Sequence, residues 1–262
     1  MNDLRVTIIQ TNLHWENAEA NRAMLEEKIA NIDSTTDVIV LPEMFTTAFS
    51  MSPEHLAEPM NFHTTKWMKN MASKTNALVL GSVIIKEGTD YFNRLLWVQP
   101  DGTVLTYDKK HLFRMAGEEK VYTSGTTTLV AEWRNWKICP LVCYDLRFPV
   151  WSRNTFHNHK AKYDVLIYVA NWPAARNSHW QTLLKSRAIE NLSFVVGVNR
   201  VGEDAKKISY DGHSMIIDPH GEILLDAGSK EAIQTTTLQF DLLESWRKKF
   251  PAYLDADDFE LK

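Results

Sequence analysis

The sequence predicts an α/β fold in which two mixed sheets pack as a sandwich with helices outside. Short β-rich segments alternate with amphipathic segments along all 262 residues. The β-rich segments are too numerous for one open sheet. Pro100-Asp101-Gly102 and Pro219-His220-Gly221 each lie between two such segments, as tight reversals require, so antiparallel pairs mix with crossovers. A parallel barrel of eight regular βα units is therefore disfavoured.

The predicted strands are short segments rich in β-branched and aromatic residues, bounded by turn-forming residues. In chain order they are Leu4–Gln10, Val38–Leu41, Ala77–Ile85, Arg94–Gln99, Val104–Tyr107, Leu129–Trp133, Lys137–Cys143, Val165–Ala170, Phe194–Val201, Ser214–Asp218, Glu222–Asp226 and Thr235–Asp241.

The predicted helices place apolar side chains on one face at helical spacing. They are Asn17–Ile32, with Leu25, Ile29 and Ile32 on one face; Thr64–Lys74, with Trp67, Met68 and Met71; a short helix after Pro149; Ser178–Asn191, with Trp180, Leu184, Arg187 and Asn191; and Leu242–Phe250. Since no linker or charge block divides the sequence, we expect one domain over residues 1–262.

Composition excludes several classes of protein. Hydrophobic residues make up 44% and charged residues 24% of the chain, as in ordinary globular domains. The net charge of −4 does not suit binding to a phosphate backbone, so we expect no nucleic-acid partner. The first apolar run, Val6 to Ile9, is too short for a signal-peptide core or a membrane span, so we expect a cytoplasmic protein without membrane attachment.

The cysteine and histidine pattern favours neither a disulfide nor a metal site. Cys139 and Cys143 are four residues apart in one predicted strand, which separates them by roughly 13 Å. His157 and His159 flank one Asn in a polar stretch and are expected to be solvated loop residues. We therefore expect no metal and no organic cofactor.

A carboxylate and a thiol each follow a buried strand. The uniformly apolar segment Val38–Leu41 leads into Pro42-Glu43, and ligands bind at such carboxyl ends in open α/β sheets. Glu43 could equally be a capping or surface residue. Cys143 lies at a corner between a strand and a turn, where a nucleophile projects from the backbone and the N–H of Tyr144 can face a developing oxyanion. Cys139, inside the strand, is expected to be core.

A nucleophilic Cys143 needs a base or a cation nearby, because a free thiol is mostly protonated at neutral pH. His111 or His179 could form a papain-like Cys–His pair with it. Glu43 together with Lys109, which follows the predicted strand Val104–Tyr107, is the other choice. Composition alone does not decide between them.

Several motifs, in order and at matching spacing, resemble the nitrilase, or carbon–nitrogen hydrolase, superfamily. They are Leu41-Pro42-Glu43, Tyr107-Asp108-Lys109-Lys110-His111-Leu112-Phe113, Cys143-Tyr144-Asp145-Leu146-Arg147-Phe148-Pro149, Ala170-Asn171-Trp172-Pro173, His179-Trp180 and Ala188-Ile189-Glu190-Asn191. The resemblance covers nearly the whole chain. It implies a four-layer αββα sandwich that pairs into homodimers.

The resemblance also implies a catalytic triad of Glu43, Lys109 and Cys143, with a cysteinyl thioester as intermediate. It implies a second glutamate before Gly125, for which Glu118 is the best match and Glu119 the adjacent rival. Lys109 has the motif position, whereas Lys110 departs from the apolar residue common there.

Within the superfamily, the chain looks most similar to the bacterial omega-amidase branch. That branch hydrolyses omega-monoamides of dicarboxylic acids, such as 2-oxoglutaramate and succinamate, so a carboxylate anchor is required. The candidate anchors are Arg114, Arg147 and Arg176, and the candidate pocket walls are Phe113, Trp172 and His179. The alternatives are an N-carbamoyl amidohydrolase, a deaminated-glutathione amidase and a catalytically silent scaffold protein.

The segment from about residue 251 is too apolar for a purely solvated chain end. It carries Tyr253, Leu254 and Phe259 among acidic residues. The resemblance implies that helices near the active site pair two copies and that such a tail crosses to the partner. We therefore expect a homodimer.

Overall fold

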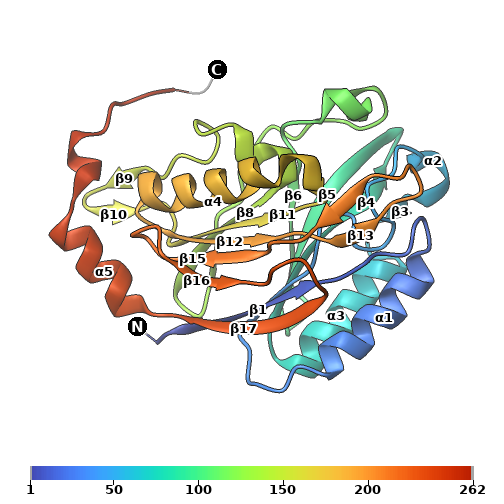
Figure 1. Cartoon of the computed structure of the whole chain (residues 1–262), viewed down its shortest axis with the longest axis horizontal. Coiled ribbons are helices and arrows are strands. Elements are labelled where there is room, and N and C mark those ends of the chain that lie inside the picture. The colour runs from blue at the N-terminus through green and yellow to red at the C-terminus, as the bar shows by residue number, and fades with distance from the viewer. Residues whose placement is uncertain (1, 261–262) are drawn as a thin grey trace.

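The computed structural model describes residues 2–260, which form two stacked sheets with helices on the outer faces (Figure 1). The first sheet has the order β17 (Ala232–Leu238), β1 (Leu4–Gln10), β2 (Val38–Val40), β4 (Leu78–Glu87), β5 (Asp90–Val98) and β6 (Val104–Asp108), and β3 (Glu58–Pro59) pairs with β4. β1, β2 and β4 are parallel, and the other neighbours along this order are antiparallel.

The second sheet is also mixed. Its order is β16 (Ile223–Asp226), β15 (Met215–Ile217), β12 (Phe194–Val198), β11 (Val165–Val169), β8 (Trp136–Val142) and β7 (Ala131–Trp133). β8, β11 and β12 are parallel, and the outer pairs are antiparallel. Both Pro-x-Gly turns connect antiparallel neighbours, as predicted, and the expected two-sheet sandwich is confirmed.

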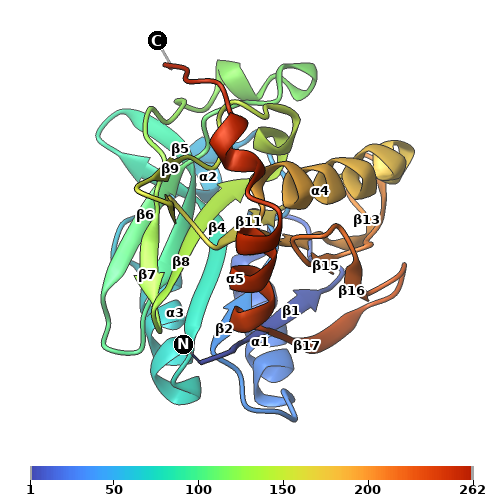
Figure 2. The ribbon, with the colours of Figure 1, turned by 90° about the vertical axis from the view of Figure 1, so that its left-hand side faces the viewer.

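Helices cover the outer face of each sheet. α1 (Ala18–Ala30) and α3 (His63–Thr75) pack on the first sheet, and α4 (Asn177–Asn191) packs on β12 and β15 of the second. α5 (Phe240–Lys249) and the segment after it run along one end of the sandwich (Figure 2). The short α2 (Pro53–Leu56) was not predicted. No helix within residues 2–260 has both the length and the apolar character needed to cross a membrane.

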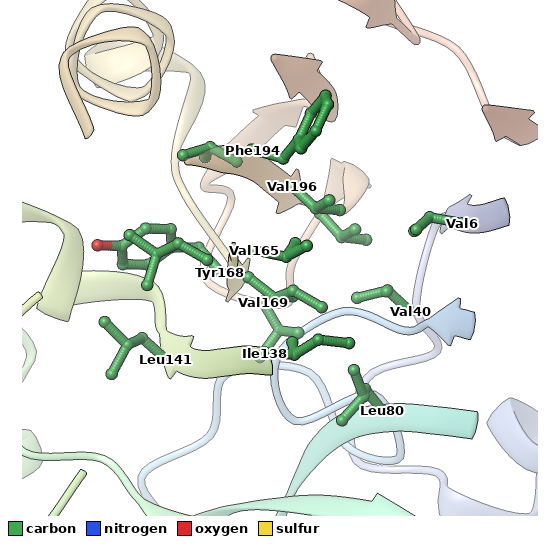
Figure 3. Close-up of a cluster of buried hydrophobic side chains, with 14 of the residues drawn as sticks. Val6, Val40, Leu80, Ile138, Leu141, Val165, Tyr168, Val169, Phe194 and Val196 are labelled. Atoms are coloured by element: carbon green, nitrogen blue, oxygen red, sulfur yellow. The ribbon is translucent and has the colours of Figure 1, made fainter. Parts of the chain in front are cut away.

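Apolar side chains from the facing strands form the core between the sheets. Val6, Val40 and Leu80 of the first sheet lie opposite residues of the second sheet that include Ile138 and Val165 (Figure 3). All five are fully buried. This apolar contact fixes the two sheets relative to one another and hence the strand ends that carry the polar site.

Gly197 on the outer face of β12 allows α4 to approach the second sheet closely. A Cβ atom there would lie 2.5 Å from Leu184 Cδ1 and 2.8 Å from Trp180 Cζ2. Both distances are shorter than van der Waals contact, so any larger residue would push α4 away from the sheet.

Two sequence-based expectations about elements are wrong. The segment after Pro149 forms only turns, because the main chain of Asn154 is held by Asn191 Oδ1 before a helix can extend. The predicted strand Phe194–Val201 breaks after Val198, where the Asn199 side chain binds main-chain oxygens of other segments. The chain then forms the hairpin β13 (Val201–Glu203) and β14 (Ser209–Asp211); another unpredicted hairpin joins β9 (Phe156–His157) and β10 (Lys160–Ala161).

Candidate active site

Three segments that follow β2, β6 and β8 bring their polar side chains together. Glu43 comes three residues after the end of β2, whereas Lys109 and Cys143 directly follow β6 and β8. Glu43 and Lys109 are 0% and 1% exposed, and Cys143 is 9% exposed. Because β8 belongs to a different sheet from β2 and β6, the packing of the two sheets determines how the thiol lies relative to the charges.

Lys109 is bound between two buried carboxylates. Its Nζ donates to Glu43 Oε1 at 2.9 Å and to the two oxygens of Glu118 at 2.9 and 3.0 Å. The other Glu43 oxygen accepts from the main-chain N–H of Asn171 at 2.8 Å, and Glu118 Oε2 accepts from Phe113 N–H at 2.5 Å. Charges buried this deeply are tolerable only when they are paired and hydrogen-bonded in this way.

These neighbours shift the pKa of each group in a definite direction. Burial alone would lower the pKa of Lys109, but the charges of Glu118 and Glu43 outweigh it and raise the pKa, so the ammonium is held charged. Burial, together with the charge of Glu43, raises the pKa of Glu118. Burial raises the pKa of the Cys143 thiol well above its ordinary value, the charge of Glu43 raises it further, and Lys109 lowers it. The thiol is therefore protonated at rest and needs a base to become a nucleophile.

Cys143 occupies a strained backbone position at the start of a short 3₁₀ helix, η3 (Cys143–Arg147). Its φ of 43° lies in the left-handed region, which costs a side-chain-bearing residue free energy. Asp145 holds this corner: its Oδ2 accepts from Val142 N–H and from the Tyr107 hydroxyl, at 3.1 and 2.7 Å. The thiol of Cys143 thus projects from this corner of the backbone. The N–H of Tyr144 lies in the first turn of η3, where N–H groups lack an acceptor within the helix.

The two candidate histidines face other partners. His111 Nδ1 lies 2.8 Å from Asp145 Oδ1, and its ring stacks on Phe148. His179 lies on the exposed side of α4, with its Nδ1 3.1 Å from Arg147 Nη2. The thiol of Cys143 instead lies 4.0 Å from the main-chain oxygen of Asn171, whose N–H binds Glu43, and the charge of Glu43 acts on the thiol. This geometry favours the Glu43–Lys109 arrangement over a Cys–His pair.

A cavity of about 400 Å³ opens above Cys143 and Lys109. Its lining includes the apolar residues Phe49, Met51 and Phe113. Arg147 and Arg176 also border it, and their guanidinium groups lie 4.8 and 5.4 Å from the ring centres of Trp172 and Phe113. Asp204 and Lys206 add one charge of each sign. The cavity therefore suits a small molecule with an apolar middle and an anionic end.

The structure separates the predicted binding residues into two groups. Phe113, Tyr144, Arg147, Trp172 and Arg176 border the cavity. Arg114 is exposed and borders a neighbouring cavity instead, whereas Met115 and Ala116 of the same turn, η1 (Arg114–Ala116), border the cavity above Cys143. His179 reaches only the outer side of Arg147. The expectation that Arg114 and His179 contact the same pocket is therefore not met.

Glu118 and Glu119, the two candidates for the second glutamate, lie in different surroundings. Glu118 begins the 3₁₀ helix η2 (Glu118–Lys120) and is fully buried on Lys109. Glu119 borders the neighbouring cavity, next to Arg114. Lys110 does not join the charged cluster either, because its Nζ lies over the ring of Trp151.

Sequence reasoning missed several residues of the site. Asn93 on β5 contacts both carboxylates, Asn171 binds Glu43, and Lys206 and Tyr210 of the β13–β14 hairpin border the cavity. Asn171 belongs to a motif, Ala170-Asn171-Trp172-Pro173, that resembles the nitrilase superfamily, whereas nothing in the sequence around Asn93 indicates a functional residue. Within residues 2–260, no three His, Cys, Asp or Glu side chains are grouped to hold a metal ion.

Comparisons with known proteins agree with this geometry. Residues 5–248 match the model of the carbon–nitrogen hydrolase family. The chain is 48% identical over 262 residues, the whole of both chains, to omega-amidase YafV of Yersinia enterocolitica. It is 31% identical to 2-oxoglutaramate amidase of Bacillus subtilis (strain 168), covering 95% of this chain and 96% of the relative.

A solved structure shows the same fold. The crystal structure of XC1258 from Xanthomonas campestris, a CN-hydrolase superfamily protein with an arsenic adduct in its active site, matches with a TM-score of 0.98. The two chains are 41% identical, and the match covers all of both.

Iodoacetamide should label Cys143 faster than Cys139. Cys143 borders the cavity, which gives the reagent access to its thiol, whereas Cys139 lies within β8 and is 2% exposed. Peptide mass spectrometry after brief exposure of the folded protein measures both rates, and denatured protein, in which both thiols react, is the control. Faster labelling of Cys139 would contradict this description of the site.

Proposed function

The chain belongs to the carbon–nitrogen hydrolase family, and from this premise we propose that it is an omega-amidase. It hydrolyses the terminal amide of a small dicarboxylic acid monoamide, of the succinamate or 2-oxoglutaramate type, to the dicarboxylic acid and ammonia. The observation that carries this proposal is the buried Glu43–Lys109–Glu118 cluster beside Cys143, below a cavity that two arginines border.

In the first half-reaction, Glu43 accepts the proton of Cys143 while the sulfur attacks the amide carbon. The carbonyl oxygen becomes an oxyanion that the Lys109 ammonium and the Tyr144 N–H stabilise, and each such donor is worth about 3–4 kcal/mol of barrier. Glu43 then gives the proton to the leaving nitrogen. The C–N bond breaks, ammonia departs, and the acyl group remains on sulfur as a thioester.

In the second half-reaction, water occupies the place that ammonia has left. Glu43 takes a proton from this water as its oxygen attacks the thioester carbon, and the same two donors stabilise the second oxyanion. The C–S bond breaks, the sulfur recovers its proton from Glu43, and the acid product leaves. One carboxyl group thus acts first as base and then as acid in each half-reaction.

Glu118 does not take part in these proton transfers. Both of its oxygens accept from Lys109, so the ammonium keeps these two contacts when Glu43 is protonated. Burial raises the pKa of Glu118 and the charge of Lys109 lowers it, so the protonation of Glu118 depends on its charged neighbours.

Arg147 is the best-placed anchor for the substrate carboxylate. It lies on η3, the same short helix that carries Cys143, so its distance from the thiol is set by local geometry. Within residues 2–260, the guanidinium contacts of Arg147 and Arg176 are with aromatic rings and His179 rather than with a carboxylate. Both therefore remain available for a bidentate carboxylate, and Arg176 is the second candidate.

Replacing the base should abolish turnover, whereas replacing the histidines should not. Glu43→Gln cannot accept a proton, so we expect ammonia release to fall by at least about 100-fold. His111→Ala and His179→Ala are the controls, and circular dichroism verifies that each variant is folded. An equal loss in a folded histidine variant would restore the Cys–His mechanism.

Succinamate should be a far better substrate than butyramide, which lacks its terminal carboxylate. A guanidinium left unpaired in the cavity costs about 3–5 kcal/mol, so kcat/KM should differ by two to three powers of ten. Arg147→Gln should lose activity on succinamate but not on butyramide, and Arg114→Gln, outside the cavity, is the matched control. Comparable values for the two amides would leave only a general aliphatic amidase.

We also propose that two copies pair through the face formed by α4 and the C-terminal segment. Ile189, Phe250 and Phe259 are each about half exposed, and all three border one groove of about 560 Å³. Exposed apolar groups gathered in this way are typical of an interface. Tyr253 stacks on Phe156 and so holds this segment, which includes η5 (Ala252–Asp255), against the domain.

Sedimentation velocity at micromolar concentration tests the homodimer. We expect twice the chain mass of 30.2 kDa, and Ile189→Asp should shift the protein toward monomer because it buries a charge in the apolar interface. Phe62→Asp, at a similarly exposed apolar residue beside α3, is the control. A wild-type protein that sediments as a monomer would rule the homodimer out.

A further inference from the structure

Asn93 contacts every charged member of the buried cluster. It lies on β5, is 1% exposed, and donates from its side-chain Nδ2 to Glu43 Oε1 at 2.8 Å and to Glu118 Oε1 at 3.2 Å. Its main-chain oxygen accepts from the N–H of Lys109 at 3.0 Å. One neutral residue therefore bridges both carboxylates and fixes the backbone of the lysine between them.

The cluster needs such a neutral donor for electrostatic reasons. Glu43 and Glu118 share one ammonium, and two buried carboxylates side by side favour protonation of one of them. A hydrogen bond to the ionised form opposes that protonation without adding charge. The two N–H bonds of a single amide group can serve one carboxylate each, which is the arrangement seen here.

The orientation of the Asn93 amide supports this role. Its Oδ1 is buried and has no hydrogen-bond partner within residues 2–260, which is an unfavourable state for an acceptor. The reversed amide would place that oxygen against two carboxylates. The contacts of the NH2 group with Glu43 and Glu118 therefore determine how the side chain is oriented.

We propose that Asn93 is a positioning residue for amide hydrolysis: it holds both carboxylates against Lys109 and keeps Glu43 ionised, ready to accept the proton of Cys143. Asn93 contacts the carboxylate of Glu43 but does not border the cavity. The kinetic part of this inference rests on the proposed function, whereas the electrostatic part does not. The titratable groups that act on Glu43 or feel its charge are Lys109, Glu118, Cys143, Tyr122 and Tyr210.

The pH profile of kcat tests the kinetic part. Asn93→Ala removes a donor to ionised carboxylates, which raises their pKa, so the acid limb should move up by about one pH unit. We expect kcat to fall by up to about 100-fold, with KM nearly unchanged because the cavity is bordered by other residues. Asn93→Asp keeps the side-chain volume but adds a third carboxylate, so its acid limb should move further.

The control variant is Asn154→Ala, which removes another buried asparagine whose side chain binds Tyr163 and Asn191 rather than the charged cluster. Asn154 Nδ2 donates to the neutral main-chain oxygens of Tyr163 and Asn191, so its loss should lower stability and leave the acid limb unchanged. If Asn93→Ala keeps the wild-type acid limb as Asn154→Ala does, the proposal is overturned.

Thermal unfolding as a function of pH tests the electrostatic part without any substrate. A donor lowers the folded-state pKa of a carboxylate, so the stability it contributes is present at neutral pH and is lost as the pH falls through that pKa. The Tm deficit of Asn93→Ala should therefore shrink from about pH 7 to about pH 4, whereas that of Asn154→Ala stays constant. A constant deficit for Asn93→Ala would overturn the proposal.

The pH profile of kcat and the pH dependence of the Tm deficit distinguish a failure of the omega-amidase proposal from a failure of the role proposed for Asn93. If the wild-type protein releases ammonia from a different class of amide, the omega-amidase proposal fails and the pH profile is measured on that amide. If it releases none, the proposed function fails, and the pH dependence of the Tm deficit alone decides the role of Asn93.

Discussion

The pairing of one buried ammonium with two buried carboxylates is the interaction on which this site depends. Lys109, Glu43 and Glu118 come from three separate segments, and each is fully or almost fully hidden from solvent. Removing one charge would leave the others unpaired in a medium that solvates them poorly. The fold must therefore deliver all three together, and the apolar packing between the sheets provides that rigidity.

The same cluster explains how a buried cysteine works without a histidine. Burial raises the pKa of the Cys143 thiol, so a stable thiolate does not form before substrate arrives. In the proposed mechanism, proton transfer to Glu43 accompanies attack, and Lys109 stays charged to stabilise the oxyanion. His111 contributes at a distance: with Tyr107 it binds Asp145, which ties the lysine segment to the corner that carries the thiol.

Local signals predicted part of this arrangement. The strand end before Glu43 and the corner at Cys143 could be predicted from the sequence, because strand ends and sharp turns have characteristic sequences. The family resemblance selected Lys109 over Lys110. Asn93 was missed because an asparagine on a strand carries no local signal, and its partners lie 50 and 25 positions away in sequence. Arg114 was misplaced because the direction of its side chain depends on the turn η1, which residue type alone does not reveal.

In the proposed mechanism, Cys143 carries the acyl group of the substrate while Glu43 moves the proton. Rapid acid quenching of the enzyme during turnover of succinamate, followed by intact-mass and peptide mass spectrometry, detects such an intermediate. We expect a succinyl group in thioester linkage to Cys143, and none in Glu43→Gln at the same time point. Turnover without any acyl adduct at Cys143, or an adduct on another residue, would contradict this mechanism.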